Sequence, residues 1–312
     1  MTDTAAERLY MLSFDHRASF EKELIGITGT PTAEEHQRIC ELKAVIYAGF
    51  VNAITNGVPP KASAVLVDED FGADVARTAR AAGHLLAMPV ERSGQDEFDF
   101  EFGADFAEHV ERFDPDFVKV LVRYNPDGDG NLNRRQAGRL AQLSDWLHAH
   151  RRRFLFELLV PPTAEQQASA NGSQDRYDTQ VRPALVVRTI ADLQAAGVEP
   201  DIWKIEGLDD RADCERVVAQ ARTGGREHVT CVVLGRGADL VRVARWLTTA
   251  APVAGYIGFA VGRTIWLDPL RDHVAGRLDR PVAVEGIAAN YRQMVDVYAA
   301  ADPATVHSAP DG

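Results

Sequence analysis

The sequence is poor in the residues that build disulfide frameworks and metal sites. Its three cysteines, Cys40, Cys214 and Cys231, are far apart and form no C-x-x-C pair. This pattern disfavours a small disulfide-bonded fold and a thiolate metal site, and it is typical of reduced thiols in an intracellular protein. The nine histidines show no H-E-x-x-H or related ligand spacing. The sequence therefore predicts no metal centre.

Positive charge and long apolar runs are also scarce. The 312 residues include 34 lysines and arginines against 46 aspartates and glutamates, a formal net charge of −12. Nucleic acid and anionic membranes are not expected as partners, because both attract a large basic surface. The N-terminus, MTDTAAERLY, lacks the apolar run of a signal peptide. The most apolar window, AAPVAGYIGFAVG, is too short to span a bilayer, so we expect a cytoplasmic protein.

Short apolar runs alternate with segments of helical periodicity along most of the chain. Thr32–Thr55 opens with a capping box of Thr32 and Glu35, and Asn133–His148 also has amphipathic spacing. Eight strands are predicted between such segments: Tyr10–Phe14, Ala64–Val67, Leu85–Pro89, Phe117–Val122, Phe154–Leu159, Ile202–Ile205, Cys231–Leu234 and Tyr256–Ala260.

Eight strands, each followed by a helix, are typical of a (β/α)8 TIM barrel, an α/β fold that forms one domain. A doubly wound open sheet is the main alternative, but no G-x-G-x-x-G turn follows the first strand. We expect the barrel to occupy residues 1–301. The segment 302–312 has too little apolar content to pack and is expected to be disordered.

Four charged residues fall on the inward face of their predicted strands. Strand side chains alternate between two faces, so in FVKVLVR the valines share one face while Lys119 and Arg123 belong to the other. The same alternation directs Asp15, Glu157 and Lys204 inward. We expect Asp15, Lys119, Glu157 and Lys204 to meet at the carboxyl ends of the strands, where barrel enzymes build their active sites.

Two interpretations of this cluster remain open from the residues. A buried salt-bridge cluster would only fill the barrel, although such clusters are weak stabilisers. Alternatively, a lysine near a second positive charge and away from water loses its proton more easily, and the free amine attacks carbonyl carbon. In that case Lys204 is the nucleophile and Glu157 carries protons. Glu206, on the same face, either pairs with Lys204 or lies beyond it at the rim.

Glycines and arginines follow the last two predicted strands, in LGRGAD and AVGRTIW. The loops after strands seven and eight form the usual phosphate site of a TIM barrel. Ordinary turn glycines beside exposed arginines are the alternative. The candidate phosphate-binding residues are Gly235, Arg236, Gly237, Gly262 and Arg263.

Several other segments allow two interpretations. His16 either binds substrate or orients Asp15. Residues 161–178 form a mobile lid or an inert insertion, and the aromatic-rich residues 91–105 contact substrate or a neighbouring subunit, or fold their phenylalanines inward. The run DGDGNL lacks the glycine that a calcium loop needs at its sixth position. It is predicted to be a turn in which Asn131 or Asn133 caps the next helix.

Five phrases of the sequence, in order, carry a family resemblance: FVKVLVRYNPDGD, FLFELLVPP, DIWKIEGLDD, VVLGRGAD and GFAVGRTIW. They resemble the 2-deoxy-5-keto-gluconate 6-phosphate aldolase domain that some bacteria fuse to the 5-dehydro-2-deoxygluconokinase of myo-inositol catabolism. The likeness runs from Tyr10 to Tyr298 and lacks the kinase half, so the chain is expected to act alone or beside a separate kinase. More distantly, the chain is similar to class I tagatose-bisphosphate and sulfofructose-phosphate aldolases, which are Schiff-base barrels.

The resemblance implies an activity and roles for individual residues. It makes Lys204 the imine-forming lysine, supported by Lys119, Glu157 and Asp15, and it makes Arg263 a phosphate ligand. The reaction would need no metal and no cofactor beyond the covalent imine. The implied substrate is 2-deoxy-5-keto-D-gluconate 6-phosphate, and the products are dihydroxyacetone phosphate and malonate semialdehyde.

Some points stay open after this resemblance. There are two alternatives to this activity: the protein cleaves another ketose phosphate, or it is a non-catalytic barrel that binds sugar phosphate. The sequence GRG replaces the serine that is expected near Gly235 in the tagatose enzymes, which affects the phosphate position. Arg123, on the inward face, is a further candidate for binding substrate or phosphate. The sequence also leaves open association into a homo-oligomer.

Overall fold

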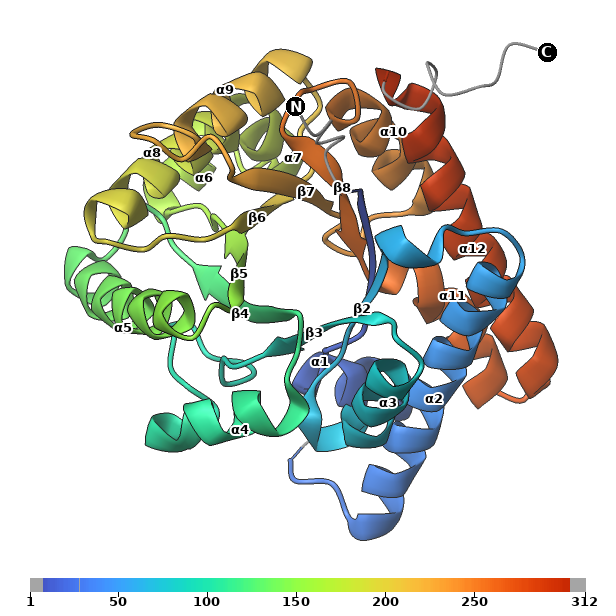
Figure 1. Cartoon of the computed structure of the whole chain (residues 1–312). Coiled ribbons are helices and arrows are strands. Elements are labelled where there is room, and N and C mark those ends of the chain that lie inside the picture. Colours follow the sequence, from blue (N-terminus) through green and yellow to red (C-terminus); the bar gives the residue numbers. More distant parts are fainter. Residues whose placement is uncertain (1–7, 28, 304–312) are drawn as a thin grey trace, which may run out of the picture.

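The computed structural model describes residues 8–27 and 29–303. Eight parallel strands form a closed barrel in which each strand pairs with the next and β8 pairs with β1 (Figure 1). Each strand begins and ends within one residue of its predicted position. The strands are β1 (Leu9–Ser13), β2 (Ser63–Leu66), β3 (Leu85–Pro89), β4 (Phe117–Arg123), β5 (Arg153–Leu159), β6 (Ile202–Glu206), β7 (Thr230–Leu234) and β8 (Tyr256–Val261). The predicted (β/α)8 fold is therefore confirmed.

Helices surround this barrel (Figure 1). The longer ones are α2 (Ala33–Thr55), α3 (Glu69–Ala81), α4 (Phe106–Phe113), α5 (Gly130–Ala149), α8 (Arg182–Ala195), α9 (Arg211–Ala221), α10 (Leu240–Ala250), α11 (Arg263–Val274) and α12 (Arg280–Ala301). Short helical segments are α1 (Ala18–Phe20), η1 (Glu21–Ile25), η2 (Pro60–Ala62), η3 (Gly103–Asp105), α6 (Ala164–Ser169), α7 (Gln174–Arg176) and η4 (Tyr177–Val181). None of the helices in residues 8–27 and 29–303 combines the length and apolar content of a membrane span.

The capping signals were predicted correctly for one helix and wrongly for another. Thr32 and Glu35 form the predicted capping box at the start of α2. Helix α5 instead begins after Asp129, whose carboxylate accepts hydrogen bonds from the backbone N–H groups of Asn131 and Leu132. The predicted asparagine caps are therefore wrong. Asn133 lies inside the helix, where its amide donates to the backbone carbonyl of Asn125.

The alternation of side chains separates two apolar layers. Side chains such as Leu12, Val118 and Phe156 face the helices and join the large outer core. A smaller group fills the inside of the barrel and includes Met11, Phe117, Leu155, Ile202 and Val232. Because Phe117 and Ile202 begin their strands, this plug occupies the amino end of the barrel. The space at the carboxyl end is left for polar side chains.

The long connections contain short ordered elements. Residues 161–178 form α6, α7 and the start of η4, and the hydroxyl of fully buried Tyr177 donates to the carbonyl of Val160 at 2.7 Å. In residues 91–105, Glu91 and Phe100 form an antiparallel bridge, and Phe98 is buried. Phe98 thus packs inward, as one of the interpretations predicted, whereas Phe100 and Phe102 are half-buried and Phe102 stacks on His109.

The carboxyl end of the barrel domain reaches slightly beyond the predicted boundary. Asp302 follows α12, is buried, and pairs with Arg8 beside the start of β1. The predicted disordered tail therefore does not include Asp302. Of the remaining tail, Pro303 is described and residues 304–312 lie outside the described residues.

Candidate active site

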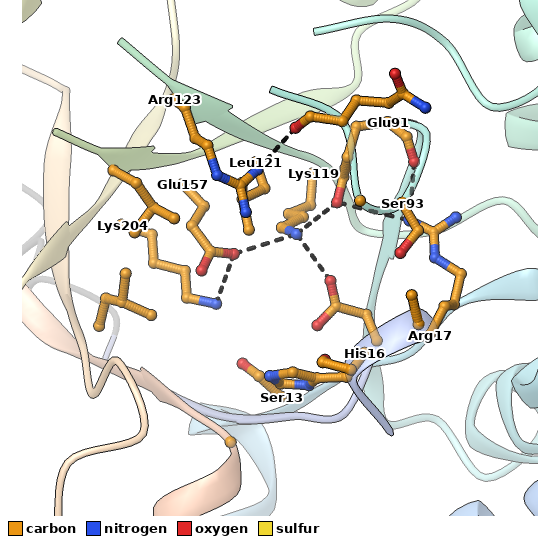
Figure 2. Close-up of a pocket in the computed structure, with 18 of the residues that line it drawn as sticks. Ser13, His16, Arg17, Glu91, Ser93, Lys119, Leu121, Arg123, Glu157 and Lys204 are labelled. Carbon is orange, nitrogen blue, oxygen red and sulfur yellow. Dashed lines mark hydrogen bonds and ion pairs between the residues drawn. The ribbon is translucent and has the colours of Figure 1, made fainter. Parts of the chain in front are cut away.

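A cavity of 290 Å³ lies at the carboxyl ends of the strands. Figure 2 shows the polar side chains that converge there from β1, β4, β5, β6 and the loop after β3. Most of the predicted site residues line it, namely Asp15, His16, Lys119, Arg123, Glu157, Lys204, Arg236, Gly237, Gly262 and Arg263. Gly235 is placed differently, because it packs against Val243 and Val261 behind the cavity.

Lys119 is the centre of the charged cluster (Figure 2). Its ammonium donates to Asp15 Oδ2 at 2.8 Å and to Glu91 Oε1 at 2.7 Å, and it lies 3.1 Å from Glu157 Oε2. Burial acts to lower the pKa of Lys119, but the carboxylates of Asp15, Glu157 and Glu91 outweigh burial and raise it. Lys119 is therefore a fixed positive charge at neutral pH.

Lys204 lies against Glu157 because the two residues are direct partners on neighbouring strands. The register of β5 and β6 aligns Glu157 with Lys204, so both side chains point into the barrel at the same level. Lys204 Nζ donates to Glu157 Oε2 at 2.9 Å, and both residues are buried. Burial acts to raise the pKa of Glu157, but Lys119 and Lys204 lower it. The carboxylate is thus held ionised between two lysines.

Asp15 and His16 follow the end of β1. Although burial opposes ionisation of Asp15, the charges of Lys119 and Lys204 hold its pKa well below the usual range. Burial lowers the pKa of His16 to about 4, so its ring is neutral at pH 7. Within the described chain, Nδ1 of His16 has no hydrogen-bond partner. Lys119 therefore orients Asp15, and His16 remains available to a ligand.

Glu91 is a cluster member that the sequence reasoning missed. It lies two residues beyond β3, is 6% exposed, and receives a hydrogen bond from Lys119. Arg17, also missed, donates to the backbone carbonyl of Glu91 at 2.8 Å. Burial raises the pKa of Glu91, while Lys119 and Arg17 oppose that rise. The alternation through Ala87 and Pro89, continued past the strand end, would have placed Glu91 inside.

The opposite side of the cavity is formed by the start of α11. Gly262 precedes this helix, and a Cβ atom there would lie 2.3 Å from the carbonyl oxygen of Ser13, so only glycine fits. Arg263 is the first residue of α11, and its Nη1 lies 2.8 Å from Glu23 of η1. The N-terminus of a helix attracts anions through its free N–H groups and its dipole. The start of α11 can therefore attract an anion to this end of the cavity.

Arg236, which is partly exposed, and buried Glu206 belong to one charged network beside the cavity. Glu206 accepts from the backbone N–H of Val160 and lies 3.1 Å from Arg236 and 3.8 Å from Arg182. Arg236 also donates to Asp178 at 2.8 Å. Glu206 therefore lies beyond Lys204 and does not pair with it. Arg236 ties the segment 161–178 to the strand ends, in addition to lining the cavity.

The described residues contain no group of three or more histidine, cysteine, aspartate or glutamate side chains arranged to hold a metal ion. The cations that face the three carboxylates are instead lysine and arginine side chains. The cluster thus resembles a site for amine and proton chemistry on an anionic ligand.

The chain is thus a TIM barrel with a lysine–carboxylate cluster at the carboxyl ends of its strands. The chain belongs to the family described as "uncharacterized protein conserved in bacteria (DUF2090)", whose model matches residues 1–302. Comparison with curated proteins gives no match. Among solved structures, the fold is similar to fructose-bisphosphate aldolase from Plasmodium falciparum in complex with TRAP and a small-molecule inhibitor. The TM-score is 0.60 at 13% identity, covering 92% of this chain and 90% of that chain.

Proposed function

We propose that the protein is a class I aldolase that cleaves a phosphorylated keto sugar acid through a Schiff base on Lys204. The observation that carries this proposal is the 2.9 Å contact between Lys204 Nζ and Glu157 Oε2 beside the fixed charge of Lys119. A buried amine beside a proton carrier is the arrangement that imine formation needs. The fold shared with a fructose-bisphosphate aldolase supports the reaction class.

The first half of the reaction forms the imine. The amine of Lys204, once Glu157 has taken its proton, attacks the keto carbon, while Lys119 donates a hydrogen bond to the keto oxygen. Glu157 then returns a proton to the carbinolamine hydroxyl, which leaves as water. The product is a positively charged iminium on Lys204.

The second half breaks the carbon–carbon bond. The β-hydroxyl of the substrate loses its proton to Glu157, which the dehydration has left ionised. The hydroxyl oxygen forms the aldehyde carbonyl, and the electron pair of the broken bond moves to the iminium nitrogen as an enamine. Ionised Asp15 binds this hydroxyl and accepts its hydrogen bond. Protonation of the enamine carbon and hydrolysis then release the second product and regenerate Lys204.

The substrate that best suits this site carries its phosphate at the start of α11, near Gly262 and Arg263. Within that class, we propose 2-deoxy-5-keto-D-gluconate 6-phosphate, which gives dihydroxyacetone phosphate and malonate semialdehyde. A panel that also contains tagatose 1,6-bisphosphate and sulfofructose phosphate distinguishes this substrate from ketoses that the same machinery would cleave.

Borohydride reduction in the presence of dihydroxyacetone phosphate, followed by peptide mass mapping, tests the proposal. The expected result is a reduced adduct on Lys204, which disappears in Lys204→Ala and persists in Lys61→Ala, a control at an exposed lysine. An adduct elsewhere, or full activity of Lys204→Ala, contradicts the proposal. Loss of turnover on adding a chelator contradicts its metal independence. Phosphate-dependent binding without any turnover supports the non-catalytic alternative instead.

A further inference from the structure

Arg123 differs from the other arginines that line the cavity. Four of them are engaged with carboxylates: Arg17 with Glu101 at 2.9 Å, Arg92 with Asp99 at 3.8 Å, Arg236 with Asp178 at 2.8 Å and Arg263 with Glu23 at 2.8 Å. Within residues 8–27 and 29–303, Arg123 forms no ion pair with a carboxylate. Its Nη1 donates to the backbone carbonyl of Gln95 at 2.8 Å. Its positive charge therefore has no counter-ion.

The acidic residues near Arg123 do not neutralise it. Glu97, which also lines the cavity, is held by Arg135 at 2.6 Å and by Arg139 at 2.7 Å. Asp96 is exposed, so water and salt screen its charge. The guanidinium of Arg123 is thus available to an anion inside the cavity.

The position of Arg123 is opposite the expected phosphate end. Arg123 ends β4, and alternation from Lys119 and Leu121 points its side chain into the barrel (Figure 2). In a closed ring of eight strands, β4 lies across from β8, and β6 lies midway. A substrate with its phosphate at Arg263, after β8, and its keto carbon at Lys204, on β6, directs its other end toward Arg123.

We propose that Arg123 binds a carboxylate at the substrate end remote from the phosphate, and so selects keto acids over neutral ketoses. The contact with Gln95 uses Nη1 and holds the guanidinium in one orientation, while a planar guanidinium can bind a carboxylate through two nitrogens. Arg123 is a specificity-determining residue in this scheme. The inference rests on the proposed aldolase function for its account of why the carboxylate enters the site.

The test uses condensation, the reverse reaction, with dihydroxyacetone phosphate and one of two aldehydes. Malonate semialdehyde carries the carboxylate, and propanal is its neutral counterpart. In Arg123→Leu, the ratio of kcat/KM for malonate semialdehyde to kcat/KM for propanal should fall about 10- to 100-fold, as expected for a lost hydrogen-bonded charge pair. Arg92→Leu, which removes a cavity arginine that is already paired, should keep the wild-type ratio. An unchanged ratio in Arg123→Leu, or a ratio that falls in Arg92→Leu instead, overturns the assignment.

A binding measurement separates this inference from the proposed function. Ligand-observed NMR with 3-hydroxypropanoate, which carries the carboxylate but cannot react, should show binding to the wild type that is lost in Arg123→Leu. If Lys204 gives no borohydride adduct but binding of 3-hydroxypropanoate depends on Arg123, the proposed Schiff-base reaction is wrong and the proposed carboxylate site at Arg123 is supported. If Lys204 does give the adduct but neither 3-hydroxypropanoate binding nor the aldehyde ratio depends on Arg123, the subsite is wrong.

Discussion

Lys119 and Lys204 contact the same oxygen atom, Oε2 of Glu157, at 3.1 and 2.9 Å. One carboxylate oxygen therefore joins a fixed charge to the proposed nucleophile. Since Lys119 also holds Asp15 and Glu91, a change at any member of the cluster alters the electrostatic field at the others. The expected effects of changing Glu157 or Lys119 follow from this shared contact.

Glu157→Gln should slow imine formation by about 10²- to 10⁴-fold, because the amide cannot carry a proton to or from the carbinolamine. Binding of dihydroxyacetone phosphate should persist, since the phosphate end of the cavity is unchanged. The rate at which the borohydride-trapped adduct accumulates measures the effect. Glu215→Gln, at an exposed glutamate, is the matched control. A wild-type trapping rate in Glu157→Gln would remove Glu157 from the mechanism.

Lys119→Met should reduce the free energy of unfolding by about 3–5 kcal/mol, because it leaves Asp15, Glu91 and Glu157 buried together without their shared cation. Urea unfolding at pH 7 measures this loss. Adding Glu91→Gln to Lys119→Met should recover part of it, since one of the three like charges is then removed. Equal free energies of unfolding for the wild type and Lys119→Met would show that the three buried carboxylates do not need the charge of Lys119 for the protein to be stable.

Much of the fold and four of the five residues of the charged cluster could be predicted from the sequence, because their positions depend on local periodicity. Alternation within the strands placed Lys119, Glu157 and Lys204 on one interior, and the same alternation continued past the end of β1 placed Asp15 there. Glu91 lies two residues beyond β3, just as Asp15 lies two residues beyond β1, but it was missed because the alternation of β3 was not continued past Pro89. Glu91 faces the cavity because the alternation of side-chain directions in β3 continues for two residues into the following loop.

The partners of Glu206 could not be predicted for a different reason. Its side chain contacts Arg182 on α8, Arg236 after β7 and the backbone of Val160 after β5. These contacts join segments that are distant in sequence, and no periodicity relates them. Among the described residues, Arg123 has no carboxylate partner, and this too is a property of tertiary structure. The nearby carboxylate of Glu97 instead accepts hydrogen bonds from Arg135 and Arg139, and the sequence does not show these contacts.

The pH dependence of the free energy of unfolding should depend on the neutral state of His16, a half-buried residue whose pKa is lowered. Its pKa in the folded protein, about 4, lies below the ordinary value of 6.5, so the unfolded chain binds a proton first as the pH falls. The contribution of neutral His16 to the free energy of unfolding should therefore be complete above pH 6.5 and decrease between pH 6.5 and 4. Below pH 4, His16 should cause no further decrease. Urea midpoints for the wild type and His16→Asn measure this, and the loss in that window should be smaller in the variant. His228→Asn, which changes an exposed histidine, is the control and should have the pH profile of the wild type. Identical pH profiles for His16→Asn and the wild type would contradict the prediction.

Closure of the barrel should depend on the absence of a side chain at Gly258. This residue pairs with Leu9 of β1 and with Val232 of β7, and a Cβ atom there would lie 1.9 Å from the carbonyl oxygen of Leu9. The obstacle is backbone of the neighbouring strand, which cannot rotate away, so Gly258→Ala must separate β8 from β1. We expect a loss of about 3 kcal/mol in the free energy of unfolding.

Gly276→Ala is the matched control for Gly258→Ala. Both glycines have positive φ, +153° at Gly258 and +70° at Gly276, but a Cβ atom at Gly276 would meet no heavy atom within 4 Å. The control should lose only the backbone strain of an alanine at positive φ, about 1–2 kcal/mol. The difference between the two variants, measured by urea unfolding, isolates the contact between β8 and β1. Equal losses would mean that the strands can move apart at this point without disturbing the barrel.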